Sequence, residues 1–154
     1  MPDRGVFLAA SLTLVLVVAG AFAIPEYFAY ELLKSTIFVV VAVMVFFGED
    51  KFPYMLGMVA PIFWVIFSLL TGEFSRDFAA LSRFLHLKSS GALETPLHGF
   101  AMLAGLALLV LSGRAWRKQI TDRFLGKTFA LAVIVSLIWV GAITASFIFG
   151  GRPH

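Results

Sequence analysis

The stretch that decides the fold is TPLHGFAMLAGLALLVLSG, residues 95–113. It is apolar over about 20 residues, which is the length of an α-helix that crosses the hydrocarbon core of a bilayer. Only hydrogen bonds within the segment satisfy a backbone surrounded by lipid, so the stretch predicts a membrane-spanning helix over about residues 96–112.

One face of this predicted helix carries small side chains and begins with a histidine. His98, Ala101, Gly105 and Ser112 fall at i, i+3, i+7 and i+14, which places them on one seam. Small residues let a neighbouring backbone or a flat ligand come close. We therefore expect the other helices to pack around this seam.

The composition of the whole chain agrees with a membrane protein. The 154 residues are 60% hydrophobic and 14% charged, with a mean hydropathy of +0.96, whereas a soluble domain is roughly 45–50% apolar and about one-quarter charged. The absence of cysteine excludes disulfides, thiolate catalysis and cysteine-ligated metals. The net charge of +3 is small, so nucleic acid is not an expected partner.

The predicted fold class is all-α, a polytopic transmembrane helix bundle in a single domain over residues 1–154. Its five expected spans cover about residues 6–24, 27–47, 52–70, 96–112 and 128–149. Residues 73–88 are too charged to span, but their large apolar side chains recur at helical spacing, at Phe74, Phe78, Leu81 and Leu85. This pattern predicts an amphipathic helix lying in the membrane interface.

Basic residues set the expected orientation. Five spans place seven lysines and arginines on one side and five on the other, and cytoplasmic loops carry the excess. We therefore expect a cytoplasmic N-terminus, in a bacterial inner (plasma) membrane. Arg114, Arg117 and Lys118 belong to the richer side, where they either bind anionic lipid headgroups or only fix the topology.

His98 is the most distinctive candidate for a binding site. Ionisable residues inside membrane spans tend to be functional, and an imidazole can ligate the metal of a haem or chlorophyll, with Ala101 and Gly105 making room for the ring. The alternative is a structural histidine, hydrogen-bonded to Glu94 or to water. The sequence leaves both interpretations open.

Glu31 and Lys34 form the second candidate, because they lie one helical turn apart in the second expected span. They either begin a relay for protons or ions, or form an i,i+3 ion pair whose lysine reaches outward to the interface. The ion pair is favoured, because no acidic residue lies deeper in any expected span.

These features favour a non-catalytic accessory or structural subunit of a larger membrane complex, of the bioenergetic or photosynthetic kind. Its expected partners are other membrane subunits or a second copy, bound through small-residue helix faces, together with membrane lipids. One alternative is a haem- or chlorophyll-binding electron-transfer subunit that uses His98. Another is a small carrier or channel for an uncharged or lipidic solute, gated by the kink expected at Pro61. A membrane enzyme ranks last.

Overall fold

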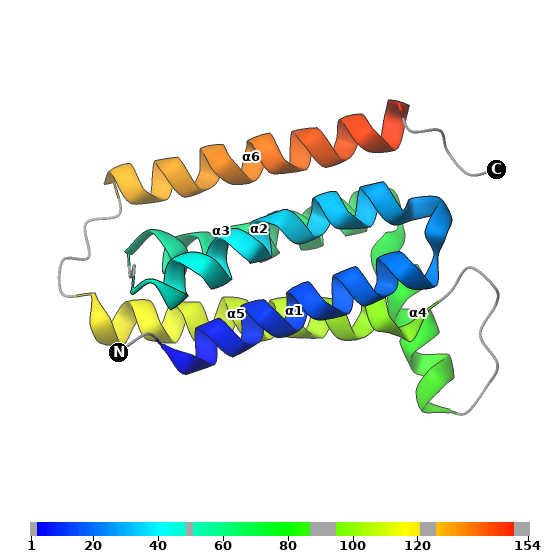
Figure 1. The fold of residues 1–154 in the computed structure, drawn as a ribbon, viewed down its shortest axis with the longest axis horizontal. Coiled ribbons are helices and arrows are strands. Elements are labelled where there is room, and N and C mark those ends of the chain that lie inside the picture. The colour runs from blue at the N-terminus through cyan, green and yellow to red at the C-terminus, as the bar shows by residue number, and fades with distance from the viewer. Residues whose placement is uncertain (1–2, 49–50, 87–94, 121–125, 150–154) are drawn as a thin grey trace.

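The computed structural model describes residues 3–48, 51–86, 95–120 and 126–149, and these form an all-α bundle (Figure 1). The elements are α1 (Arg4–Ala23), the short 3₁₀ turn η1 (Pro25–Tyr27), α2 (Phe28–Phe46), α3 (Lys51–Thr71), α4 (Glu73–Leu85), α5 (Pro96–Gln119) and α6 (Gly126–Phe149). Five of the described helices are long and apolar enough to cross a membrane: α1, η1 with α2, α3, α5 and α6. The predicted fold class is confirmed.

Two of the spans begin at side chains that cap them. The Asp3 carboxylate accepts hydrogen bonds from the backbone N–H groups of Gly5, at 2.9 Å, and Val6, at 3.2 Å. The Thr95 hydroxyl accepts one from the backbone N–H of Leu97 at 3.2 Å, ahead of a proline in the first turn of α5. Such caps satisfy backbone donors that have no partner within the helix.

Helix α5 is longer than the sequence predicted, because it continues beyond residue 112 to Gln119. Ala115 and Trp116 extend its buried face against the bundle, so the helix has a reason to persist after the apolar run ends. Basic residues in the last turn are also favourable at the negative end of a helix dipole. The two basic side chains in the last turn, Arg117 and Lys118, are exposed, and so is Arg114 in the preceding turn.

The core lies among α1, α2, α3 and α5, and α6 covers one side of this group (Figure 1). The Trp139 ring attaches α6 to the core, with its centroid 6.1 Å from that of Phe38, which in turn lies 5.3 Å from the Trp64 centroid. The Trp139 indole nitrogen donates a hydrogen bond to the backbone oxygen of Leu33 at 3.0 Å. A buried tryptophan therefore contributes both packing and a satisfied donor.

The small-residue seam of α5 faces the interior. Ala101 and Ser112 are fully buried, and a Cβ atom added to Gly105 would lie 3.0 Å from the Trp64 ring of α3. An atom added to Gly57 of α3 would collide with the Ser112 hydroxyl. Small residues thus let α3 and α5 pack closely along this seam.

Helix α4 crosses the end of the bundle instead of running along it (Figure 1). Gly72 turns the chain from α3 into α4 with a left-handed φ of 77°. At the crossing, a Cβ added to Gly99 of α5 would lie 2.9 Å from the backbone oxygen of Asp77. Helix α4 ends at Leu85, and residues 87 and 88 of the expected 73–88 helix lie outside the described residues. Its location in a membrane interface stays a prediction.

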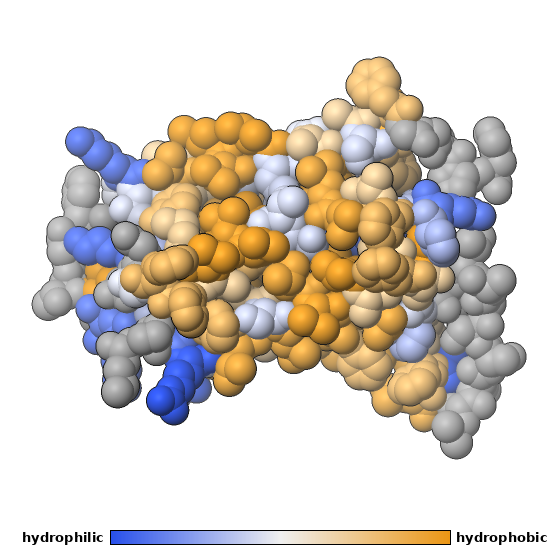
Figure 2. All heavy atoms as spheres, viewed as in Figure 1, coloured by the Kyte–Doolittle hydropathy of each residue, from blue (hydrophilic) through white to orange (hydrophobic). Residues whose placement is uncertain are grey.

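The surface separates into an apolar middle and polar ends (Figure 2). Exposed apolar side chains from several spans make up the middle, among them Leu12, Val15, Val43, Ile66 and Ile138. An exposed apolar area around the waist of a helical bundle is the surface that lipid covers.

Candidate functional site

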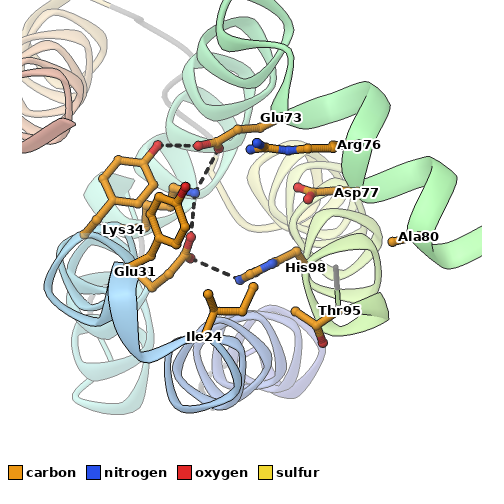
Figure 3. A pocket seen from close by; sticks show the side chains of 11 residues that line it. Ile24, Glu31, Lys34, Glu73, Arg76, Asp77, Ala80, Thr95 and His98 are labelled. Carbon is orange, nitrogen blue, oxygen red and sulfur yellow. Dashed lines mark hydrogen bonds and ion pairs between the residues drawn. The ribbon is translucent and has the colours of Figure 1, made fainter. Parts of the chain in front are cut away.

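Ionisable side chains from three helices meet inside one end of the bundle, where α2 and α5 begin and α3 passes into α4 (Figure 3). We call it the pocket end. Glu31 and Lys34 come from α2, Glu73 from the first turn of α4, and His98 from α5. The first three are 5%, 4% and 5% exposed. Two carboxylates and one ammonium group are therefore removed from water together.

Lys34 lies between the two carboxylates. Its Nζ atom is 3.0 Å from Oε1 of Glu31 and 2.9 Å from Oε2 of Glu73. The Tyr30 hydroxyl donates a hydrogen bond to the other oxygen of Glu73 at 2.6 Å, and the Lys34 ammonium lies 4.2 Å from the centre of the Tyr30 ring. Both oxygens of Glu73 thus have partners, as buried charges require.

Glu31 and His98 are less completely satisfied. Oε2 of Glu31 lies 3.4 Å from Nε2 of His98, yet both atoms are buried and neither has an aligned hydrogen-bond partner among the described residues. Leaving a buried polar atom without a partner is unfavourable by about 1–3 kcal/mol. The two atoms therefore mark the incomplete part of the cluster.

Helix α1 positions the imidazole. A Cβ atom added to Gly20 would lie 2.5 Å from Nε2 of His98, so only glycine leaves room for the ring at this point. The ring consequently lies against the backbone of α1 and faces Glu31 on α2. Glu31 and Lys34 share one side of α2 because they are three residues apart.

A cavity of about 270 Å³ adjoins the charged cluster. Figure 3 shows Arg76 and Asp77 of α4 on one wall, with Ile24 and Thr95 on the others. The lining residues that the structure describes are Ile24, Tyr27, Tyr30, Glu31, Lys34, Glu73, Arg76, Asp77, Ala80, Thr95 and His98. Polar groups that converge on a concave space are the usual feature of a binding site.

The lining carries a surplus of negative charge. Burial raises the pKa of Asp77 from 3.8 to about 6, so its carboxyl is ionised at pH 7.5. Among the described residues of the lining, three carboxylates then face two cations, Lys34 and Arg76, so the carboxylates outnumber these cations by one. A single positive charge, brought by a proton or a ligand, would neutralise the lining.

The side chain of Lys34 does not point in the direction that the sequence predicted. It contacts Glu31, as an i,i+3 ion pair requires, but its side chain does not reach outward to the interface. The reason is Glu73, which lies 39 residues later in the chain and brings a second carboxylate to the inner side of α2. Two buried carboxylates thus hold the ammonium group inside the bundle.

The residues expected beside a macrocycle are packed against protein. Ala101 is fully buried, Gly105 lies against Trp64, and the free nitrogen of His98 faces Glu31. A haem or chlorophyll ligated by His98 would require the imidazole to turn away from Glu31. That hypothesis stays a prediction, and the packing within this chain gives it no support.

The expected headgroup residues lie at the opposite end of α5 from His98 (Figure 1). A separate hollow of about 480 Å³ at that end is lined by the expected headgroup residues Arg114, Arg117 and Lys118, together with Asp3, Leu111 and Ala115. Their contact with lipid headgroups stays a prediction.

Sequence reasoning missed Glu73, Tyr30 and Asp77 as members of the site. Glu73 and Asp77 belong to the segment 73–88, which the sequence predicted to be an interfacial helix, and Tyr30 was not singled out among the residues of the second span. One signal was available, because Tyr30, Glu31 and Lys34 place three polar groups within a single turn of an expected span. The sequence alone could not place Glu73 beside these residues, because its position there depends on the crossing of α4 over α5.

The fold and the apolar surface define an integral membrane protein with a polar pocket at one end of its bundle. Comparison of the chain with protein-family models, with curated proteins and with solved structures gave no match. The function of the pocket is therefore inferred from its own chemistry.

Proposed function

We propose that this protein is an integral membrane binding protein whose pocket holds a small polar solute. The observation that carries the proposal is the pair of facing atoms, Oε2 of Glu31 and Nε2 of His98, which are buried beside the cavity and have no aligned partner in the part of the chain that the structure describes. Ionisable groups inside a membrane bundle are costly and usually mark functional sites.

A purely structural cluster would be expected to satisfy all of its own atoms. Glu73 meets this condition through Tyr30 and Lys34, whereas Glu31 meets it with only one oxygen. Half-satisfied buried networks are unfavourable, so a bound solute gives a physical reason for the arrangement.

The cavity suits a small solute. At about 30 Å³ for each water-sized group, its volume accommodates on the order of nine such groups. The lining supplies charged groups and two tyrosines, Tyr27 and Tyr30. It therefore favours a polar molecule over a lipid tail.

A test uses three probes that share a propyl chain and differ in charge: n-propylammonium, propionate and 1-propanol. We expect at least one to raise the thermal unfolding midpoint of the detergent-solubilised protein, because a ligand that binds only the folded state stabilises it. Ala80, 1% exposed, lines the cavity, so Ala80→Phe should fill it and abolish the shift.

Ala79→Phe is the matched control, because Ala79 precedes Ala80 on α4 and does not line the cavity. It should preserve the shift. If Ala80→Phe does not fold, Ile24→Phe blocks the cavity from the opposite wall. The proposal is overturned if no probe shifts the midpoint, or if the shift survives in the blocked variant.

An accessory-subunit role is a second proposal, favoured by α6. Only four of its side chains are buried, Ala132, Ser136, Trp139 and Ile143. The exposed face includes the small residues Gly141, Ala142 and Ala145, which would let another span approach closely. Native mass spectrometry of the gently extracted protein should then show a heteromeric complex or a dimer that Ala142→Leu disrupts; a monomer throughout would contradict this role.

A further inference from the structure

We propose that the solute bound in the pocket is a small organic cation with a primary ammonium group. The inference rests on the proposed binding function and specifies its ligand class. Three features support it: the charge of the lining, the way in which the pocket already holds one ammonium group, and the aromatic rings on its wall.

The charge of the lining favours a cation. Glu31 and Glu73 share a single buried ammonium, that of Lys34, while Asp77 and Arg76 add one charge of each sign. Among the described residues, the carboxylates of the lining thus outnumber its lysine and arginine by one. An anionic solute would increase this imbalance in a poorly solvated space, and a neutral solute would leave it uncorrected.

Lys34 shows how the pocket binds an ammonium group. Its Nζ atom has carboxylate oxygens at 3.0 and 2.9 Å and an aromatic ring at 4.2 Å. Charge-assisted hydrogen bonds and cation–π contact are the interactions that recognise a compact, strongly hydrated cation. Other carboxylate and aromatic groups on the same lining are available to bind a second cation.

Three groups of the lining are available to a ligand: the Oε2 atom of Glu31, the carboxylate of Asp77 and the ring of Tyr27. Within the described residues, Oε2 of Glu31 has no aligned partner, and its side chain is only 5% exposed. Asp77 lies on the α4 wall. Tyr27 also lines the cavity, with its ring centroid 6.4 Å from that of Tyr30. A ligand ammonium placed between these groups would face two carboxylates and an aromatic surface.

A proton is the natural competitor of the ligand. A proton on Asp77 would remove a carboxylate from the α4 wall. The other titratable side chains among the described lining residues are Glu31, Glu73, Lys34, Arg76, His98, Tyr27 and Tyr30. Acid should therefore weaken binding of a cation. Because burial raises the pKa of Asp77 to about 6, part of this competition falls between pH 7.5 and pH 5.

The experiment measures binding by isothermal titration calorimetry to the full chain in detergent, with n-propylammonium, propionate and 1-propanol as probes. We expect n-propylammonium alone to bind at pH 7.5. Glu31→Gln should raise its Kd by about tenfold or more, because the variant keeps the shape and removes the charge. Lowering the pH to 5 should also raise the Kd of the wild type.

Glu26→Gln is the matched control. Glu26 lies on η1 at the same end of the molecule, is exposed and does not line the cavity, so the same substitution there should leave the Kd unchanged. Gel filtration checks that both variants remain folded. If Glu31→Gln is unstable, Asp77→Asn and the pH dependence of the wild type give the same discrimination.

Failure of this inference can be distinguished from failure of the proposed function. Binding of propionate or 1-propanol that Ala80→Phe abolishes would preserve the binding function and overturn the cationic ligand. Equal affinity of n-propylammonium for the wild type and for Glu31→Gln would also overturn it. No binding of any probe would overturn both proposals.

Discussion

Charged side chains have opposite environments at the two ends of the bundle: a group of them is buried at one end, and others are exposed at the other. At the pocket end, Glu31, Lys34 and Glu73 are buried and paired with one another. At the other end, the basic side chains of α5 are exposed. Contacts there include neutral groups: the Tyr54 hydroxyl donates to Gln119 at 2.9 Å, and Gln119 donates to Asp3 at 3.3 Å.

This difference shows that charged side chains at the ends of spans do not all have the same role. An exposed cation at a helix end keeps its hydration and contributes little to stability. A buried charge must be compensated by nearby groups, and its loss affects everything that surrounds it. The pocket end therefore has the properties of a specific site, whereas the other end has those of an ordinary membrane surface.

If α5 crosses the membrane, its two ends lie on opposite sides of it. Single cysteines replacing Ser75 on α4 and Lys118 on α5 should react with an impermeant maleimide from opposite sides of sealed vesicles. Both residues are exposed, and the chain has no native cysteine. Reaction of both cysteines from one side would refute the five-span topology.

The largest energetic effect is expected for Lys34→Met. Removing one partner of a buried ion pair typically costs about 3–5 kcal/mol, because the remaining charges stay buried without compensation. Thermal unfolding in detergent should show the loss, and the triple variant that adds Glu31→Gln and Glu73→Gln should recover much of it. Lys118→Met, at the exposed end, is the control and should leave the unfolding midpoint unchanged.

The positions of the spans were largely predictable from the sequence. Lipid requires each span to satisfy its own backbone, so long uncharged runs are sufficient to locate the helices. The end of α5 was less predictable, because Ala115 and Trp116 extend the helix through tertiary packing and not through local apolar composition.

The site was only partly predictable. Glu31, Lys34 and His98 are conspicuous because ionisable residues are rare within the expected spans. Glu73 resembles any acidic residue in the first turn of an amphipathic helix, and its role depends on the crossing of α4 over α5. The inward direction of Lys34 depends on Glu73, so one missed contact changed the interpretation of both residues.

The second energetic prediction concerns the fit of His98 at the pocket end. Gly20→Ala should destabilise the protein by about 1–3 kcal/mol, because the added methyl group overlaps the imidazole and tightly packed sites tolerate extra volume poorly. Gly141→Ala is the control, since an added Cβ at that position meets none of the described residues within 4 Å. Equal stability of the two variants would show that the imidazole is not held against α1.

The smallest effect is expected from the pH dependence contributed by Asp77. Its pKa is raised from 3.8 to about 6 by burial, so the folded protein holds this proton more tightly than the unfolded chain does. The contribution of Asp77 to stability is therefore greatest below about pH 4 and is lost as the pH rises through about 6. Asp77→Asn cannot titrate, so the difference in unfolding free energy between wild type and variant should change between these pH values and be constant above them. A difference that is constant from pH 4 to pH 8 would show that the Asp77 carboxyl is as well solvated as the exposed charges at the other end of the bundle.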